Sequence, residues 1–102
     1  MRTSPSIAPH GPGQDTYIVL DDFGWIGRAW RETDEHRADR ETLIRNLLLG
    51  EFNEPIRIVG FNTSEGWSRD VTVDIADELR RRLVEYGEIS ESAKQFLQAN
   101  RR

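Results

Sequence analysis

The spacing of hydrophobic residues changes from a strand pattern to a helix pattern between residues 55 and 87. After Pro55 comes a short apolar run rich in β-branched and aromatic side chains, Ile56, Ile58, Val59 and Phe61. Such a run favours a buried strand, and a proline is tolerated at the first residue of a strand. We therefore expect a strand over residues 55–61.

A long amphipathic helix is expected over residues 70–86. Its apolar residues recur mostly at every fourth position and so share one face: Val71, Ile75, Ala76, Leu79, Leu83 and Tyr86. Acidic side chains come early in this segment and arginines come late, an order that suits the helix dipole. The spacing also predicts the ion pairs Asp77–Arg81 and Glu78–Arg82 across one helical turn.

Two strands joined by a tight turn are expected near the N-terminus. Residues 15–22 contain the apolar run Tyr17–Leu20, which suggests a central strand. Asp22-Phe23-Gly24 is a turn signal. Residues 25–32 alternate with period two and carry glycine, alanine and arginine, as edge strands do. The alternative is that the chain is already a loop from Gly27 onward.

Two shorter helices complete the expected elements. Residues 40–49 have a one-sided apolar face, with Asp39 as a candidate N-cap and Gly50 as the residue after the helix: Leu43, Ile44, Leu47 and Leu48. Ser90 is placed to cap a last helix over residues 91–99, whose inward side chains are expected to be Ala93, Phe96 and Leu97.

The order of these elements, ββαβα with a short final α, predicts an α+β fold. A hairpin is antiparallel, and the strand at residues 15–22 has the most apolar composition, so it belongs in the centre. We expect a three-stranded antiparallel sheet in the order 2-1-3, with the helices packed on one face as a two-layer sandwich. Residues 15–99 form this single domain, and residues 1–14, rich in proline and glycine, are expected to be a disordered tail.

Composition excludes several classes of function. The 102 residues carry a formal net charge of −4, which argues against a nucleic-acid partner, and contain no cysteine. His10 and His36 lack a second histidine at ligand spacing, so we expect no metal site and no cofactor. No apolar run is long enough to cross a membrane, and no secretory signal opens the chain, so a cytoplasmic protein is expected.

A sheet with helices on one face leaves its other face open to a partner. The candidates for side chains on that face are Phe23, Tyr17, Trp25 and Trp30. The alternative, to which we give equal weight, is that the N-terminal tail or the last helix covers this face. An odd separation puts Trp25 and Trp30 on opposite faces. Trp30 shares its face with Arg28 and Glu32, so we expect it to point outward and Trp25 inward. The leading functional hypothesis is a non-catalytic interaction or regulatory module, a homodimer, with an interface at Trp25, Arg28 and Trp30.

A second hypothesis places a small-molecule or nucleotide site, or a small enzyme's site, between the strand at 55–61 and the long helix. A loop there would bring polar groups to a helix start, where anions bind. The candidate ligand-binding residues are Asn62, Thr63, Ser64, Trp67, Ser68 and Arg69. The structural alternative is that Ser68 caps the helix and Trp67 covers the core. No catalytic residue is assigned, and Asp21 and Asp22 are interpreted as acids of the hairpin turn.

Three segments resemble a group of small bacterial proteins. They are Tyr-Ile-Val-Leu-Asp-Asp-Phe-Gly at 17–24, Arg-Ala-Trp-Arg-Glu-Thr-Asp at 28–34, and the run from Arg57 to Val71. The resemblance is to bacterial proteins of about this length, proteobacterial in type and without an assigned activity, and it covers roughly residues 15–82. It implies a bacterial cytoplasmic origin and no mechanism.

Overall fold

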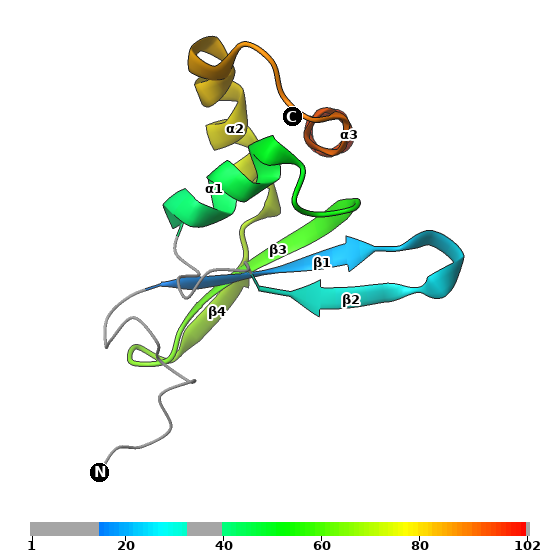
Figure 1. Ribbon diagram of the computed structural model, residues 1–102. Helices are drawn as coiled ribbons and strands as arrows, with labels where there is room; N and C mark the ends of the chain where they lie inside the picture. Colours follow the sequence, from blue (N-terminus) through cyan, green and yellow to red (C-terminus); the bar gives the residue numbers. More distant parts are fainter. Residues whose placement is uncertain (1–14, 33–39, 102) are drawn as a thin grey trace.

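The computed structural model describes residues 15–32 and 40–101 (Figure 1). The tail predicted at 1–14, the candidate N-cap Asp39 and both histidines lie outside the described residues. Along the chain the elements are β1 (Thr16–Asp22), the 3₁₀ turn η1 (Gly24–Ile26), β2 (Arg28–Arg31), α1 (Arg40–Leu49), β3 (Pro55–Asn62), β4 (Trp67–Asp70), α2 (Thr72–Tyr86) and α3 (Glu91–Ala99).

The fold is α+β, with an open antiparallel sheet and three helices. Its strand order is β2-β1-β3-β4, and every neighbouring pair is antiparallel. The predicted order 2-1-3 is therefore present, but the expectation of only three strands is wrong. Figure 1 shows the three helices on one face of the sheet, as the sequence predicted.

The fourth strand occupies the segment that was expected to be a loop. Residues 63–66 form a tight turn, in which Gly66 has a φ of 76° and donates its N–H to the Asn62 carbonyl at 2.8 Å. A positive φ of this kind suits glycine. The chain then returns along β3, with Ser68 opposite Phe61. The predicted loop 62–69 is thus a β-hairpin, and Ser68 caps no helix.

Side chains of β1 alternate between the two faces of the sheet. Tyr17, Val19 and Asp21 are buried against the helix layer, while the residues between them are half-buried on the other face. On β3, Ile58 continues the buried face. The core between sheet and helices is completed by Leu43, Ile44, Leu47, Leu48, Phe52, Val71, Ile75, Ala76, Leu79, Phe96 and Leu97.

The ring of Tyr17 lies directly against Gly60 of the neighbouring strand. A Cβ atom at Gly60 would come within 2.9 Å of the Tyr17 Cε1 atom. Glycine is needed here for space, because the aromatic ring occupies the volume that any side chain would take. Tyr17 therefore faces the helix layer, and its selection as a candidate for the open face is wrong.

The β1–β2 hairpin turns through a short 3₁₀ helix. Phe23 N–H donates to the Gly27 carbonyl at 2.8 Å, and Asp22 Oδ1 accepts from Gly24 N–H at 2.8 Å. The strand resumes only at Arg28, so the expected strand over residues 25–32 begins three residues late. The alternative of a loop from Gly27 onward is also wrong, because β2 pairs with β1 from Arg28.

The helix α2 starts directly after β4 and is tied to β3. Asp70 Oδ1 accepts from Thr72 N–H at 2.9 Å, and Val71 N–H donates to the Ile58 carbonyl at 2.8 Å. Ile75, Ala76 and Leu79 are fully buried, as the helical spacing predicts. The apolar face ends earlier than expected, because Tyr86 is 45% exposed.

The bounds of α1 and α3 agree with the sequence prediction, and Ser90 caps α3 by accepting from Ala93 N–H at 3.2 Å. Asp21 does not fit its interpretation as a turn acid. It is fully buried, and its carboxylate accepts from Asn53 N–H at 2.8 Å and from Glu54 N–H at 2.6 Å. These bonds fix the segment that enters β3 against the end of β1.

Candidate functional site

No described helix covers the second face of the sheet, and its centre is apolar. Register pairs Ile18 with Val59, Thr16 with Phe61, and Leu20 with Trp30, and cross-strand partners share a face. Trp30 is 51% exposed, and the other apolar members are half-buried. We call this surface the helix-free face; its apolar residues are Ile18, Leu20, Trp30, Val59 and Phe61.

Ion pairs flank the apolar centre at two places. Arg28 Nε lies 3.4 Å from Asp22 Oδ2 on the β1–β2 side, and Arg57 Nε lies 3.7 Å from Asp70 Oδ2 on the β3–β4 side. Partial burial opposes ionisation of Asp70. Hydrogen bonds from Thr72 and the charge of Arg57 outweigh it and hold the pKa of Asp70 below its ordinary value of 3.8. Each flank therefore carries one cation and one anion.

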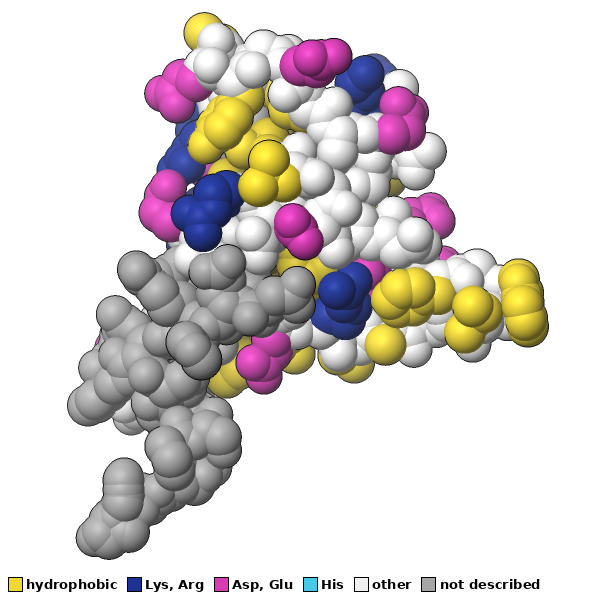
Figure 2. Space-filling model, in the orientation of Figure 1, with side chains coloured by type: hydrophobic (Ala, Val, Ile, Leu, Met, Phe, Trp, Pro, Cys, Tyr) yellow, Lys and Arg dark blue, Asp and Glu magenta, His cyan; other side chains and the backbone are white. Residues whose placement is uncertain are grey.

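The tip of the β1–β2 hairpin presents two more apolar side chains to solvent. Trp25 is 95% exposed and Ile26 is 71% exposed. Figure 2 shows hydrophobic side chains gathered at the end of this hairpin, which extends away from the helices in Figure 1. Trp25 belongs to the 3₁₀ turn and not to a strand, so its side chain does not follow the alternation of strand residues between two faces. Its predicted inward position is wrong. The outward prediction for Trp30 is confirmed.

The six residues predicted to bind a ligand do not form one site. Asn62 is buried, donating its amide to Asp15 Oδ1 at 3.0 Å and accepting from Glu65 N–H at 2.9 Å. Thr63 and Ser64 lie in the exposed turn. Ser68 lies on the helix-free face, opposite Phe61.

Trp67 and Arg69 are the two members of the predicted set that come together. Both lie on the helix side of β4, opposite Asn62 and Gly60 respectively. The Arg69 guanidinium lies over the Trp67 ring, 5.2 Å from its centroid. This distance is within the range of a cation–π contact. Trp67 is half-buried and Arg69 is exposed, so the expectation that Trp67 covers the core is met only in part.

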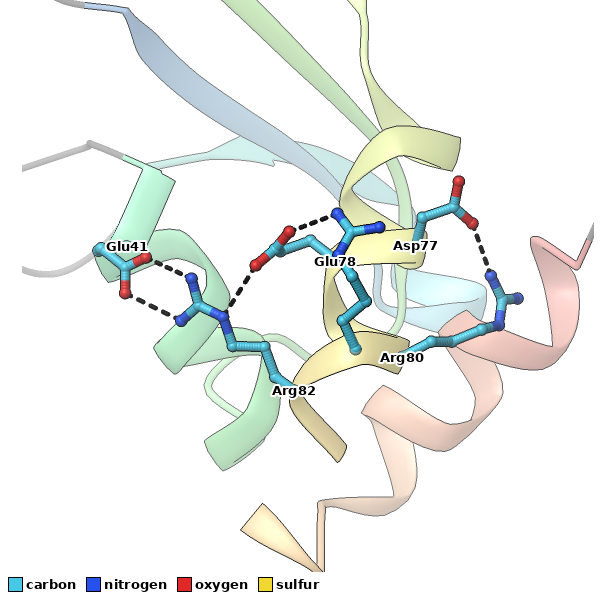
Figure 3. Close-up of polar contacts among 6 residues, drawn as sticks. Glu41, Asp77, Glu78, Arg80 and Arg82 are labelled. Atoms are coloured by element: carbon cyan, nitrogen blue, oxygen red, sulfur yellow. Dashed lines mark hydrogen bonds and ion pairs between the residues drawn. The ribbon is translucent and has the colours of Figure 1, made fainter. Parts of the chain in front are cut away.

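The three consecutive arginines of α2 are engaged by acids (Figure 3). Arg80 Nη1 lies 3.0 Å from Asp77 Oδ1, and Arg82 bridges Glu78 on its own helix and Glu41 on α1. These two acids raise the pKa of Arg82 above its ordinary value. The predicted Glu78–Arg82 pair is present. The predicted Asp77–Arg81 pairing is wrong in its partners, because Arg81 pairs with Glu78 and Asp77 with Arg80. The cluster joins α1 to α2.

Other classes of site find no support among residues 15–32 and 40–101. No group of three or more histidine, aspartate or glutamate side chains there is placed to hold a metal ion. None of the described helices has the length and apolarity to span a bilayer. The chain matches no protein-family model, no curated protein and no solved structure.

Proposed function

We propose that the protein is a cytoplasmic, non-catalytic interaction module that forms a homodimer through its helix-free face. The observation that carries this proposal is the position of Trp30. Its side chain is 51% exposed on the edge strand β2, opposite Leu20 of β1, on a face of the sheet that no described helix covers. Tryptophan is enriched among the residues that dominate binding energy at protein interfaces.

The charges around the apolar centre favour a second copy of this chain as the partner. A two-fold axis brings the same surface of two copies face to face, so each charge meets a surface of the same composition. Arg28 with Asp22, and Arg57 with Asp70, place both signs at each flank. Opposite charges are then available to each other across the axis, around an apolar centre with a polar rim.

Sedimentation velocity on the full chain over a range of micromolar concentrations tests the proposal. The wild-type sedimentation coefficient should rise with concentration. Trp30→Ala should weaken self-association by at least about tenfold, the effect of losing an interface anchor. Val84→Ala is the matched control, because Val84 is 89% exposed on α2, away from the helix-free face, and should leave association unchanged.

Two results would contradict the proposal. A wild-type protein that stays monomeric at the highest concentration removes the homodimer. Equal weakening by Trp30→Ala and Val84→Ala would place the interface elsewhere. Arg57→Glu separates the electrostatic contribution to association from the hydrophobic contribution. It should weaken association more at low salt than at high salt, because salt screens the charges.

A further inference from the structure

A cavity of about 370 Å³ lies on the helix side of the sheet, between β4 and α2. Its lining includes Trp67 and Arg69 of β4, Tyr17 of β1 and Arg40 at the start of α1. Small-molecule sites typically occupy about 300–1,000 Å³, so the cavity has room for one small ligand. It is separated from the helix-free face by the sheet itself.

Two aromatic rings of the cavity wall are held in place. The Tyr17 ring is fixed against β3 by its contact with Gly60. The Trp67 ring is held by its indole N–H, which donates to Glu65 Oε1 at 2.8 Å. Tyr17 is buried and Trp67 is half-buried, so Trp67 offers the larger aromatic surface to a ligand. A fixed ring favours a flat aromatic ligand, because stacking on it costs little conformational entropy.

The charged lining favours a ligand with one negative charge. Two of the charged lining residues are paired with residues outside the lining, Arg81 with Glu78 and Asp77 with Arg80. Arg40 and Arg69 then face Asp74, an excess of one positive charge. Within the described part of the chain, neither the Arg40 nor the Arg69 side chain has an ion-pair or hydrogen-bond partner. Their guanidinium N–H groups suit the two oxygens of a carboxylate.

We propose that this cavity binds a planar aromatic monoanion, an aromatic carboxylate in chemical class. The ring lies against Tyr17 and Trp67, and the carboxylate accepts from Arg69 and Arg40. A nucleotide would bring more negative charge than the lining balances. This inference does not depend on self-association, because the site is on the other side of the sheet.

Proton–nitrogen NMR of the tryptophan indole N–H tests the assignment. In a Trp25→Phe, Trp30→Phe variant, Trp67 supplies the only indole signal, and both replaced side chains lie outside the cavity. Three probes share one ring and differ in charge: benzoate, benzamide and benzylammonium. Benzoate should shift the Trp67 signal saturably in the millimolar range, benzamide should bind more weakly, and benzylammonium should bind weakest. The double variant also removes the tryptophan anchor of the proposed dimer, so the two proposals fail separately.

A matched pair of arginine variants completes the test. Arg69→Gln should weaken benzoate binding by about tenfold, the loss expected for one charge-assisted hydrogen bond. Arg57→Gln, on the helix-free face, should leave binding unchanged. No saturable shift with benzoate, equal binding of all three probes, or tightest binding of benzylammonium would each overturn the proposal. So would equal effects of Arg69→Gln and Arg57→Gln.

Discussion

The carboxylate of Asp21 and the guanidinium of Arg31 form an ion pair at the edge of the core, with Asp21 Oδ2 2.7 Å from Arg31 Nη1. Asp21 is fully buried, whereas the Arg31 side chain is 29% exposed. The guanidinium also lies 5.2 Å from the Phe52 ring centroid and 5.8 Å from that of Phe23. This pair therefore joins the first hairpin to the segment that leads into β3.

Replacing Asp21 should destabilise the protein strongly. In Asp21→Asn the new amide cannot accept from Arg31 and from both the Asn53 and Glu54 backbone N–H groups. Leaving one buried N–H donor without its acceptor costs about 1–3 kcal/mol of unfolding free energy. Urea unfolding followed by circular dichroism measures the loss. Asp22→Asn, one residue on and partly exposed, is the control and should cost clearly less. Equal losses of unfolding free energy in Asp21→Asn and Asp22→Asn would show that the hydrogen bonds and ion pair of Asp21 make no special contribution to stability.

A pair of aliphatic substitutions tests the orientation of α2. Leu79 is fully buried and Val84 is 89% exposed on the same helix. Leu79→Ala should lower the unfolding free energy by about 2–5 kcal/mol, through lost apolar burial and the cavity left behind. Val84→Ala should change it by less than about 0.5 kcal/mol. Thermal and urea unfolding of both variants check the prediction, and similar losses would mean that α2 is rotated about its axis.

Acid should weaken the junction between α1 and α2. Hydrogen bonds from Arg81 and Arg82 hold the pKa of Glu78 below its ordinary value of 4.5. A carboxyl group with a lowered pKa stabilises the fold above its unfolded-state pKa, and that contribution is lost as the pH falls through the folded-state value. Stability should therefore decline below about pH 4.5, and Glu78→Gln should decline less steeply there. The measurement is the unfolding free energy of wild type and Glu78→Gln as a function of pH. If the two proteins lose stability equally steeply, groups other than Glu78 cause the acid sensitivity.

The helices were predictable because each carries its own repeating apolar face. The bounds of α1 and α3 agree with the sequence pattern, and Leu79 is buried as its spacing requires. β4 was missed because Trp-Ser-Arg-Asp has one apolar residue among four and shows no alternation. The turn before β4 could have indicated this strand, because a glycine such as Gly66 after several polar residues is typical of a hairpin turn.

The chemistry of the sites depends on partners that are distant in sequence. The donors to Asp21 include Asn53 and Glu54, which no local pattern connects with the end of β1. Similarly, Trp67 and Arg69 were among the candidate ligand residues, but Tyr17 and Arg40 join them only through the fold. The position of Trp25 was predicted wrongly because it lies in a turn, where side chains do not alternate between two faces as they do in a strand.

The central pairing of β1 with β3 has a consequence for the speed of folding. The β1–β2 and β3–β4 hairpins each join residues close in sequence, whereas Val19 opposite Ile58 requires closure of about 40 residues of chain. Non-local strand pairing slows folding, because loop entropy is lost before the contacts form. The two hairpins should therefore be able to form early and independently, and the barrier should lie at the step that brings them together.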